Sequence, residues 1–201
     1  WDARSDDPAA LSLKGRLLKD RAHAASGPER STLFAAASAA YGAAHALAPA
    51  PYRAINAATA RLLAGDPTGA MAAARDVLAL LDQPGPAADT PYYLAATRAE
   101  ALLLLGDQAG AAQALDAAVA ADPDGWDDRA VTLAQLRAIL AAQGAAADWL
   151  DAYAPPASLH FAGHMGIAAG GASEATLARA VDALLTRHRI GFAWGALAAG
   201  A

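Results

Sequence analysis

The chain of 201 residues contains no cysteine, and only 6% of its residues are aromatic. The lack of cysteine excludes disulfides and thiolate chemistry, although it does not identify the compartment. No run of 18 apolar residues is free of charges or turn signals, so we expect no transmembrane helix and no membrane partner. The net charge of −5 is modest and no lysine or arginine cluster stands out, which gives no argument for nucleic acid as a partner.

Alanine dominates the composition, and apolar residues make up 56% of the chain. Alanine is the best helix former, and its small volume suits close packing between helices. Because β-branched residues are scarce, we predict a mainly α-helical fold. We expect a cytoplasmic location; a chain that begins with Trp1 is also compatible with a fragment or a processed form, so removal of a signal peptide stays open.

The segment from Ala95 to Pro123 has the pattern of two short helices joined by a tight turn. Apolar residues stand at helical spacing as far as Leu105. Gly106 tolerates the left-handed geometry of a helix C-terminus, and Asp107 can cap the next helix by accepting from its free N–H groups. We therefore predict a helical hairpin here.

The same pattern recurs, so residues 1–156 are predicted to form a stack of three to four helical hairpins. Gly65-Asp66 precedes Gly106-Asp107 by 41 residues and marks an equivalent turn. The predicted helices pair as 8–25 with 28–47, 51–63 with 67–81, 95–105 with 107–122, and 126–144 with a short helix at 146–152. Three and a half hairpins suffice for a cooperative stack.

After residue 156 the pattern changes. We predict a short strand at 158–162, a glycine-rich loop at 163–173, an amphipathic helix at 174–189 and a second strand at 190–194. This order is typical of the start of an α/β unit. Residues 157–201 are therefore predicted to be a strand–helix–strand tail, a short incomplete α/β segment.

The hairpin at 95–123 resembles the tetratricopeptide repeat, whose period is 34 residues. Its small residues, its turn and its terminal proline fall where that family has them, at Ala99, Gly106-Asp107, Ala111, Ala118 and Pro123. Ala95 and Leu102 depart from the usual Trp and Tyr. The resemblance implies a tetratricopeptide-like α-α solenoid.

Three segments, 52–59, 92–107 and 126–137, resemble the bacterial relatives of the helical region called the TRAF-binding domain in stress-activated MAP3 kinases. In those proteins a Rossmann-like domain can follow, and segments 161–165 and 191–200 are similar to parts of it. The resemblance implies a signalling or sensor scaffold that is not a kinase. After Met165 the chain lacks the acidic residue usual in that family.

In such a stack the first helix of each hairpin lines a concave groove. Tyr52 and Tyr93 take equivalent positions there and could grip a peptide through their large contact area and their hydroxyls. Alternatively, both pack against the preceding hairpin. The same alignment directs into the groove Ile55, Thr59, Leu62, Ala96, Glu100, Leu103, Val131, Ala134 and Ala138.

Four further candidate binding residues are polar positions on otherwise apolar first helices, namely Asn56, Arg98, Gln135 and Arg137. Converging in a groove, they would hold a carboxylate or a phosphate. In the alternative interpretation they tie adjacent helices together, with Arg98 reaching Glu100 or a neighbouring carbonyl.

No residue constellation specifies a reaction, so we predict no catalytic residues and no cofactor. His160 and His164 lie four residues apart without a third ligand nearby, which does not favour a metal site. The glycines from Gly163 precede a helix but lack the G-x-G-x-x-G order of a nucleotide loop.

Together these patterns predict a non-enzymatic scaffold that binds a protein or peptide partner in its groove, with a homo-oligomer as a further possibility. The alternative is a sensor or hydrolase for a nucleotide- or nucleoside-derived ligand, with its site in a Rossmann-like domain that starts near Ser158.

Overall fold

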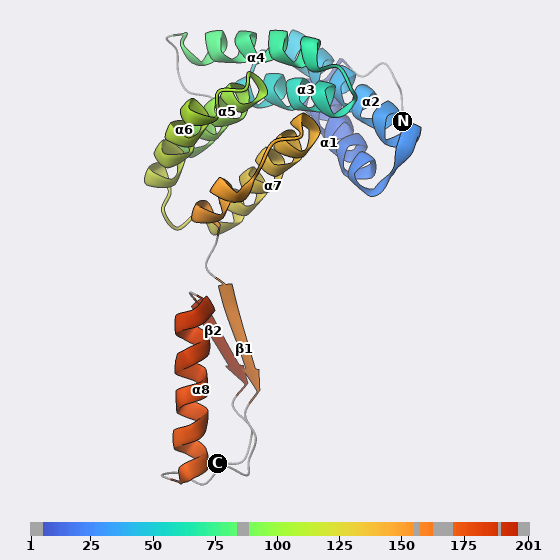
Figure 1. Ribbon diagram of the computed structural model, residues 1–201. Coiled ribbons are helices and arrows are strands. Elements are labelled where there is room, and N and C mark those ends of the chain that lie inside the picture. Colours follow the sequence, from blue (N-terminus) through green and yellow to red (C-terminus); the bar gives the residue numbers. More distant parts are fainter. Residues whose placement is uncertain (1–5, 84–88, 155–156, 163–170, 189, 197–201) are drawn as a thin grey trace. The chain divides into compact units, whose positions relative to one another are not determined.

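The computed structural model describes residues 6–83, 89–154, 157–162, 171–188 and 190–196 (Figure 1). The chain divides into two compact units, residues 1–152 and 153–201, and each is described by itself. The part of the chain described here is mainly α. None of its helices is both long enough and apolar enough to cross a membrane.

The first unit is a series of helices. They are α1 (Pro8–Ala24), α2 (Gly27–Leu47), α3 (Pro51–Leu63), α4 (Pro67–Leu81), α5 (Pro91–Leu104), α6 (Gln108–Ala121), α7 (Trp126–Gln143) and the 3-10 helix η1 (Asp148–Tyr153). These bounds follow the predicted pairs of helices closely. The local signals therefore fix where helices begin and end in this unit.

The turns between paired helices use the predicted glycine and aspartate. Gly65 and Gly106 adopt φ values of 98° and 84°, in the left-handed region that favours glycine. Asp66 and Asp107 then accept hydrogen bonds at their side chains from the backbone N–H groups of Gly69 and Gly110. Each turn thus ends one helix and caps the next.

Consecutive helices pack as pairs, α1 with α2, α3 with α4 and α5 with α6, as expected for an array of helical hairpins. The first helices of the hairpins, α3, α5 and α7, also contact one another (Figure 1). Close approach depends on small residues, because Ala99, Ala111 and Ala118 are fully buried between helices. The predicted packing of small residues is confirmed.

The second unit contains β1 (Ala157–Ala162), α8 (Ala172–His188) and β2 (Ile190–Ala196). The two strands pair in parallel, with Leu159 opposite Ala193 and Phe161 opposite Gly195. Residues 163–170, which include His164 and most of the predicted glycine-rich loop, lie outside the described residues.

Two glycines on neighbouring helices provide a matched test of the packing. A Cβ atom at Gly15 of α1 would lie 2.7 Å from the ring of Tyr41, which is fully buried, whereas a Cβ at Gly42 of α2 meets no described atom within 4 Å. We expect Gly15→Ala to lower the free energy of unfolding by about 1–3 kcal/mol through overpacking. Gly42→Ala should raise it by roughly 0.5–1 kcal/mol, because alanine favours helix.

Urea unfolding followed by circular dichroism at 222 nm measures both changes. Equal stabilisation by the two alanines would contradict the close packing of α1 on the Tyr41 ring.

Candidate functional site

Polar side chains from four helices meet in the layer formed by the first helices of the hairpins. We call Lys19, Asn56, Thr59, Glu100 and Gln135 the polar cluster. Thr59 Oγ1 and Gln135 Nε2 both donate to Glu100 Oε1, the second over 3.0 Å. Lys19 Nζ donates to Asn56 Oδ1 over 2.7 Å. The cluster connects α1 with α3, and α3 and α7 with α5.

The repeat explains why these side chains meet. Thr59 and Glu100 stand 41 residues apart, the same separation as the glycines of the two turns, so they occupy equivalent positions in successive hairpins. Because α3 and α5 lie side by side, equivalent residues face each other across the contact. The amide of Asn56 is tied locally, since its Nδ2 donates to the carbonyl of Tyr52 over 2.8 Å.

The two charged members of the cluster are shifted toward their neutral forms. Burial raises the pKa of Glu100, while the hydrogen bonds from Thr59 and Gln135 and the charge of Lys19 act in the opposite direction. Burial likewise lowers the pKa of Lys19, against the attraction of Glu100. Desolvation therefore outweighs the mutual attraction of the two charges at each group.

The two tyrosines predicted to bind a partner are both accessible. Tyr52 is 43% exposed and Tyr93 is 41% exposed. The ring of Tyr52 packs edge to face on Tyr41, and the ring of Tyr93 packs in the same way on Tyr92. These contacts fix the ring planes while leaving part of each ring open.

The hydroxyl of Tyr93 also crosses to the next hairpin. It donates to Asp128 Oδ1 over 2.6 Å, and this bond together with partial burial raises the pKa of Tyr93 to about 12. A neutral phenol and an acceptor carboxylate are therefore held together between α5 and α7 across the neutral pH range. Their position makes a polar edge beside the exposed ring.

The predicted arginines lie apart from the polar cluster. Arg98 Nη2 lies 2.6 Å from Asp82 Oδ1, and Arg137 Nη2 lies 2.9 Å from Asp151 Oδ1. Arg98 therefore pairs with Asp82, whereas the alternative interpretation of the sequence had it reaching Glu100 or a neighbouring carbonyl. Both ion pairs are largely solvated, so each stabilises the fold by no more than about 1 kcal/mol.

The predicted groove lining divides between core and surface. Ile55, Leu62, Ala96 and Leu103 are at most 8% exposed and belong to the core, which corrects their assignment to an open groove. Val131, in contrast, is 70% exposed. Helical spacing predicts the side of the helix on which a residue lies, but not how deeply that side is buried. Here the neighbouring hairpin covers most of it.

Two well-placed polar residues were not identified from the sequence. Lys19 was missed because its partners lie 37 or more residues away, although a lysine beside Leu18 on a packed helix face was a usable signal. Arg129 is only 5% exposed; its guanidinium stacks on Trp126 at 4.2 Å and donates to the carbonyl of Pro123 over 2.7 Å. Arg129 thereby binds a backbone carbonyl just after the C-terminal end of α6.

The chemistry of the polar cluster is cohesion between helices, because Asn56 and Thr59 are at most 7% exposed and burial dominates the pKa shifts of Glu100 and Lys19. It offers a carboxylate, an ammonium group, two amides and a hydroxyl, all supported by helices. Within the described ranges no three His, Asp or Glu residues come together as they would around a metal ion.

The raised pKa of Glu100 predicts a specific pH dependence of stability. As pH rises above the ordinary value of 4.5, the carboxyl ionises in the unfolded chain before it ionises in the folded one. The free energy of unfolding of the wild type should therefore fall, relative to that of Glu100→Gln, between pH 4.5 and the folded pKa, and then stay level. Each unit of separation corresponds to about 1.4 kcal/mol.

Urea titrations at several pH values measure this difference, with the exposed Glu29→Gln as the matched control. A difference between wild type and Glu100→Gln that does not change with pH would show that the carboxyl is not desolvated.

We compared the chain with protein-family models, curated proteins and solved structures, and found no match. The fold supports a coarser description than the sequence resemblance: helices packed as sequential pairs.

Proposed function

We propose that residues 1–156 form a non-enzymatic, tetratricopeptide-like scaffold that binds a protein or peptide partner, in a bacterial signalling or stress-sensing protein. One observation carries the proposal. Tyr52 and Tyr93 stand 41 residues apart at equivalent positions of adjacent first helices, and both rings remain about two-fifths exposed.

The support for this surface is physical. Tyrosine brings a large contact area at a low entropic cost, since only two side-chain angles must be fixed. Here that cost is reduced further, because Tyr41 and Tyr92 already hold the two rings. In this proposal Asn56 and Gln135 hold the supporting layer together through the polar cluster, while Arg98 and Arg137 provide charged contacts at the margins.

A second candidate function concerns the second unit, in which we predict a Rossmann-like domain that starts near Ser158. Its β1 and β2 pair in parallel and α8 lies between them in sequence, and ligands of parallel sheets bind beyond the carboxyl ends of the strands. A sensor or hydrolase for a nucleotide- or nucleoside-derived ligand would use that edge. A rise in the melting temperature of the full chain with such compounds, unaffected by changes at Tyr52 and Tyr93, would favour this candidate.

The scaffold proposal predicts that a peptide selected for binding to the chain binds less tightly when the two tyrosines are removed. Random peptides displayed on phage are selected on the full chain, and the enriched peptides are then titrated by fluorescence anisotropy. We expect Tyr52→Ala/Tyr93→Ala to weaken binding at least about tenfold, as for aromatic residues at the centre of an interface. Tyr93→Phe should bind nearly as the wild type, because the ring is kept.

The matched control is Leu47→Ala, which removes a side chain that is 51% exposed on α2. Circular dichroism confirms that each variant folds. Enriched peptides that bind the double variant as tightly as the wild type would contradict a role for the tyrosines.

A further inference from the structure

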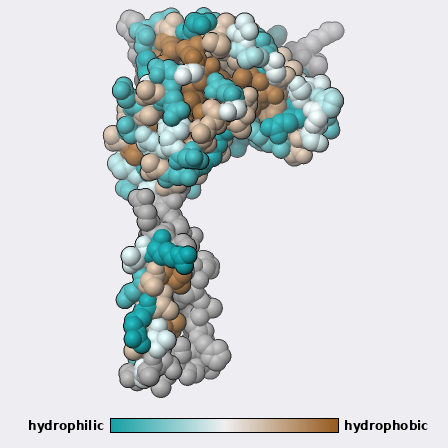
Figure 2. All heavy atoms as spheres, viewed as in Figure 1, coloured by the Kyte–Doolittle hydropathy of each residue, from teal (hydrophilic) through white to brown (hydrophobic). Residues whose placement is uncertain are grey.

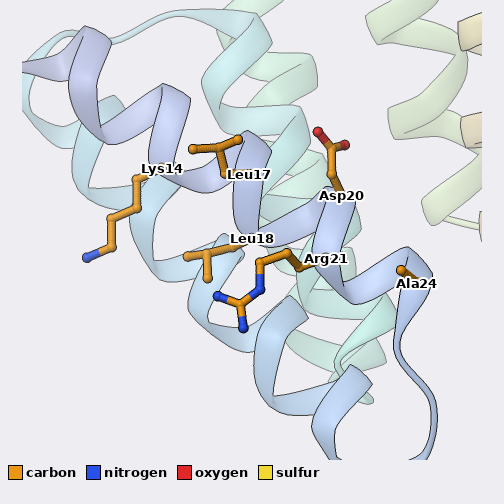
Figure 3. Close-up of a pocket in the computed structure, with 6 residues that line it drawn as sticks. All are labelled: Lys14, Leu17, Leu18, Asp20, Arg21 and Ala24. Atoms are coloured by element: carbon orange, nitrogen blue, oxygen red, sulfur yellow. The ribbon is translucent and has the colours of Figure 1, made fainter.

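The outward face of α1 is an apolar stripe with basic flanks. Leu13 and Leu17 are each 49% exposed. Beside them a hollow is lined by residues of α1, with Leu17 and Leu18 between Lys14 and Arg21, and with one acidic residue, Asp20, in the lining (Figure 3). We call Leu13, Leu17, Lys14 and Arg21 the α1 stripe.

The next first helix shows what this face is suited for. Three alanines of α3 and its C-terminal cap face α2 at helical spacing, namely Ala57, Ala60 and Ala64. Ser38 of α2 donates to the carbonyl of Ala57, and Ala60 and Ala64 pack with Phe34 and Ala37. A first helix of this array thus covers the preceding hairpin with small apolar residues, and the α1 stripe contains the large apolar side chains that α1 leaves exposed.

Helix α7, the first helix of the fourth predicted hairpin, exposes an apolar face at the other end of the helical array. Gly106 and Gly144, both with positive φ at the ends of α5 and α7, align the two helices. This alignment places Val131 where α5 has Tyr93, the residue that reaches forward to Asp128 of the next hairpin. Val131 is 70% exposed, with Ala130 and Ala134 exposed beside it.

The two faces carry opposite charges. Helix α1 contains four basic residues and one acidic residue, and Lys14 and Arg21 flank its stripe. Residues 122–128 contain four aspartates and no basic residue; Asp124 and Asp127 are exposed, and Asp127 lies four residues, about one helical turn, before Val131. We call Asp124, Asp127, Ala130, Val131 and Ala134 the α7 stripe.

We propose that the α1 stripe of one copy docks on the α7 stripe of a second copy of this chain. The partner is a second copy because the chain itself carries the complementary surface, in both charge and apolar character, at the other end of its helical array. Such a head-to-tail contact continues the stacking of hairpins from one copy to the next. Since the two faces differ, assembly grows beyond a dimer unless it closes into a ring.

Charge reversal tests this contact in the full chain. Lys14→Glu/Arg21→Glu alters only the α1 stripe, and Asp124→Lys/Asp127→Lys alters only the α7 stripe. Sedimentation velocity over a range of concentrations measures the mass of each variant, of the mixture, and of the fourfold variant that carries all four changes. Arg75→Glu/Asp76→Lys, on the exposed side of α4, is the matched control.

We expect the wild type and the control to grow past a dimer with concentration. Either double variant alone should associate at least about tenfold more weakly, since like charges then face each other. The one-to-one mixture and the fourfold variant should both recover assembly, because each restores opposite charges across the contact.

Three results would overturn the proposal. The first is a wild type that stays monomeric at its highest soluble concentration. The second is dimerisation of Asp124→Lys/Asp127→Lys alone at wild-type strength, which would indicate that α1 pairs with α1. The third is a folded fourfold variant that stays monomeric. The test does not use the tyrosine surface, so its failure and that of the proposed scaffold are distinguishable.

Discussion

The close approach of alanine-lined helices is the constraint on which the rest of the structure depends. Ala99, Ala111 and Ala118 are fully buried where α5 meets α6, and a larger side chain at any of them would push the helices apart. Interhelical distance in turn sets whether equivalent residues on successive first helices can touch. Thr59 reaches Glu100, and Glu100 reaches Gln135, only because the array is this tightly packed.

In the polar cluster, the free-energy cost of burying two charged groups is set against the gain from their hydrogen bonds. Burial opposes the charged forms of both Lys19 and Glu100, as the directions of their pKa shifts indicate. Hydrogen bonds from Thr59 and Gln135 offset part of that cost. Alanine faces are smooth and nearly interchangeable, whereas these bonds form in one register only. Their contribution is therefore better understood as selection of one stacking arrangement than as net stabilisation.

What could be predicted from the sequence was local, and what could not was long-range. Gly106-Asp107 predicted a helix end, a turn and a cap, because the conformations involved are determined within a few residues. Arg98 was predicted to line a groove or, alternatively, to reach Glu100 or a neighbouring carbonyl, but it pairs with Asp82 at the C-terminal end of α4. Its direction depends on how far α5 is rotated, and apolar spacing fixes that rotation only roughly.

The depth at which a residue is buried was the second quantity that apolar spacing could not predict. Tyr52 and Leu62 belong to the same predicted face of α3, but the first is 43% exposed and the second 8%. The difference arises because the preceding and following hairpins cover the helix unevenly along its length.

The same argument bears on the ends of the array. A position in a repeat is apolar because a neighbouring hairpin covers it, so at the first and last hairpins that reason no longer holds within one chain. Leu17 of α1 and Val131 of α7 nevertheless keep the apolar character of covered positions, although Asp20 lies on the same side of α1 as Leu17. We propose on this ground that each end of the array docks on the opposite end of another copy, since Lys14 and Arg21 at one end complement the charges of Asp124 and Asp127 at the other.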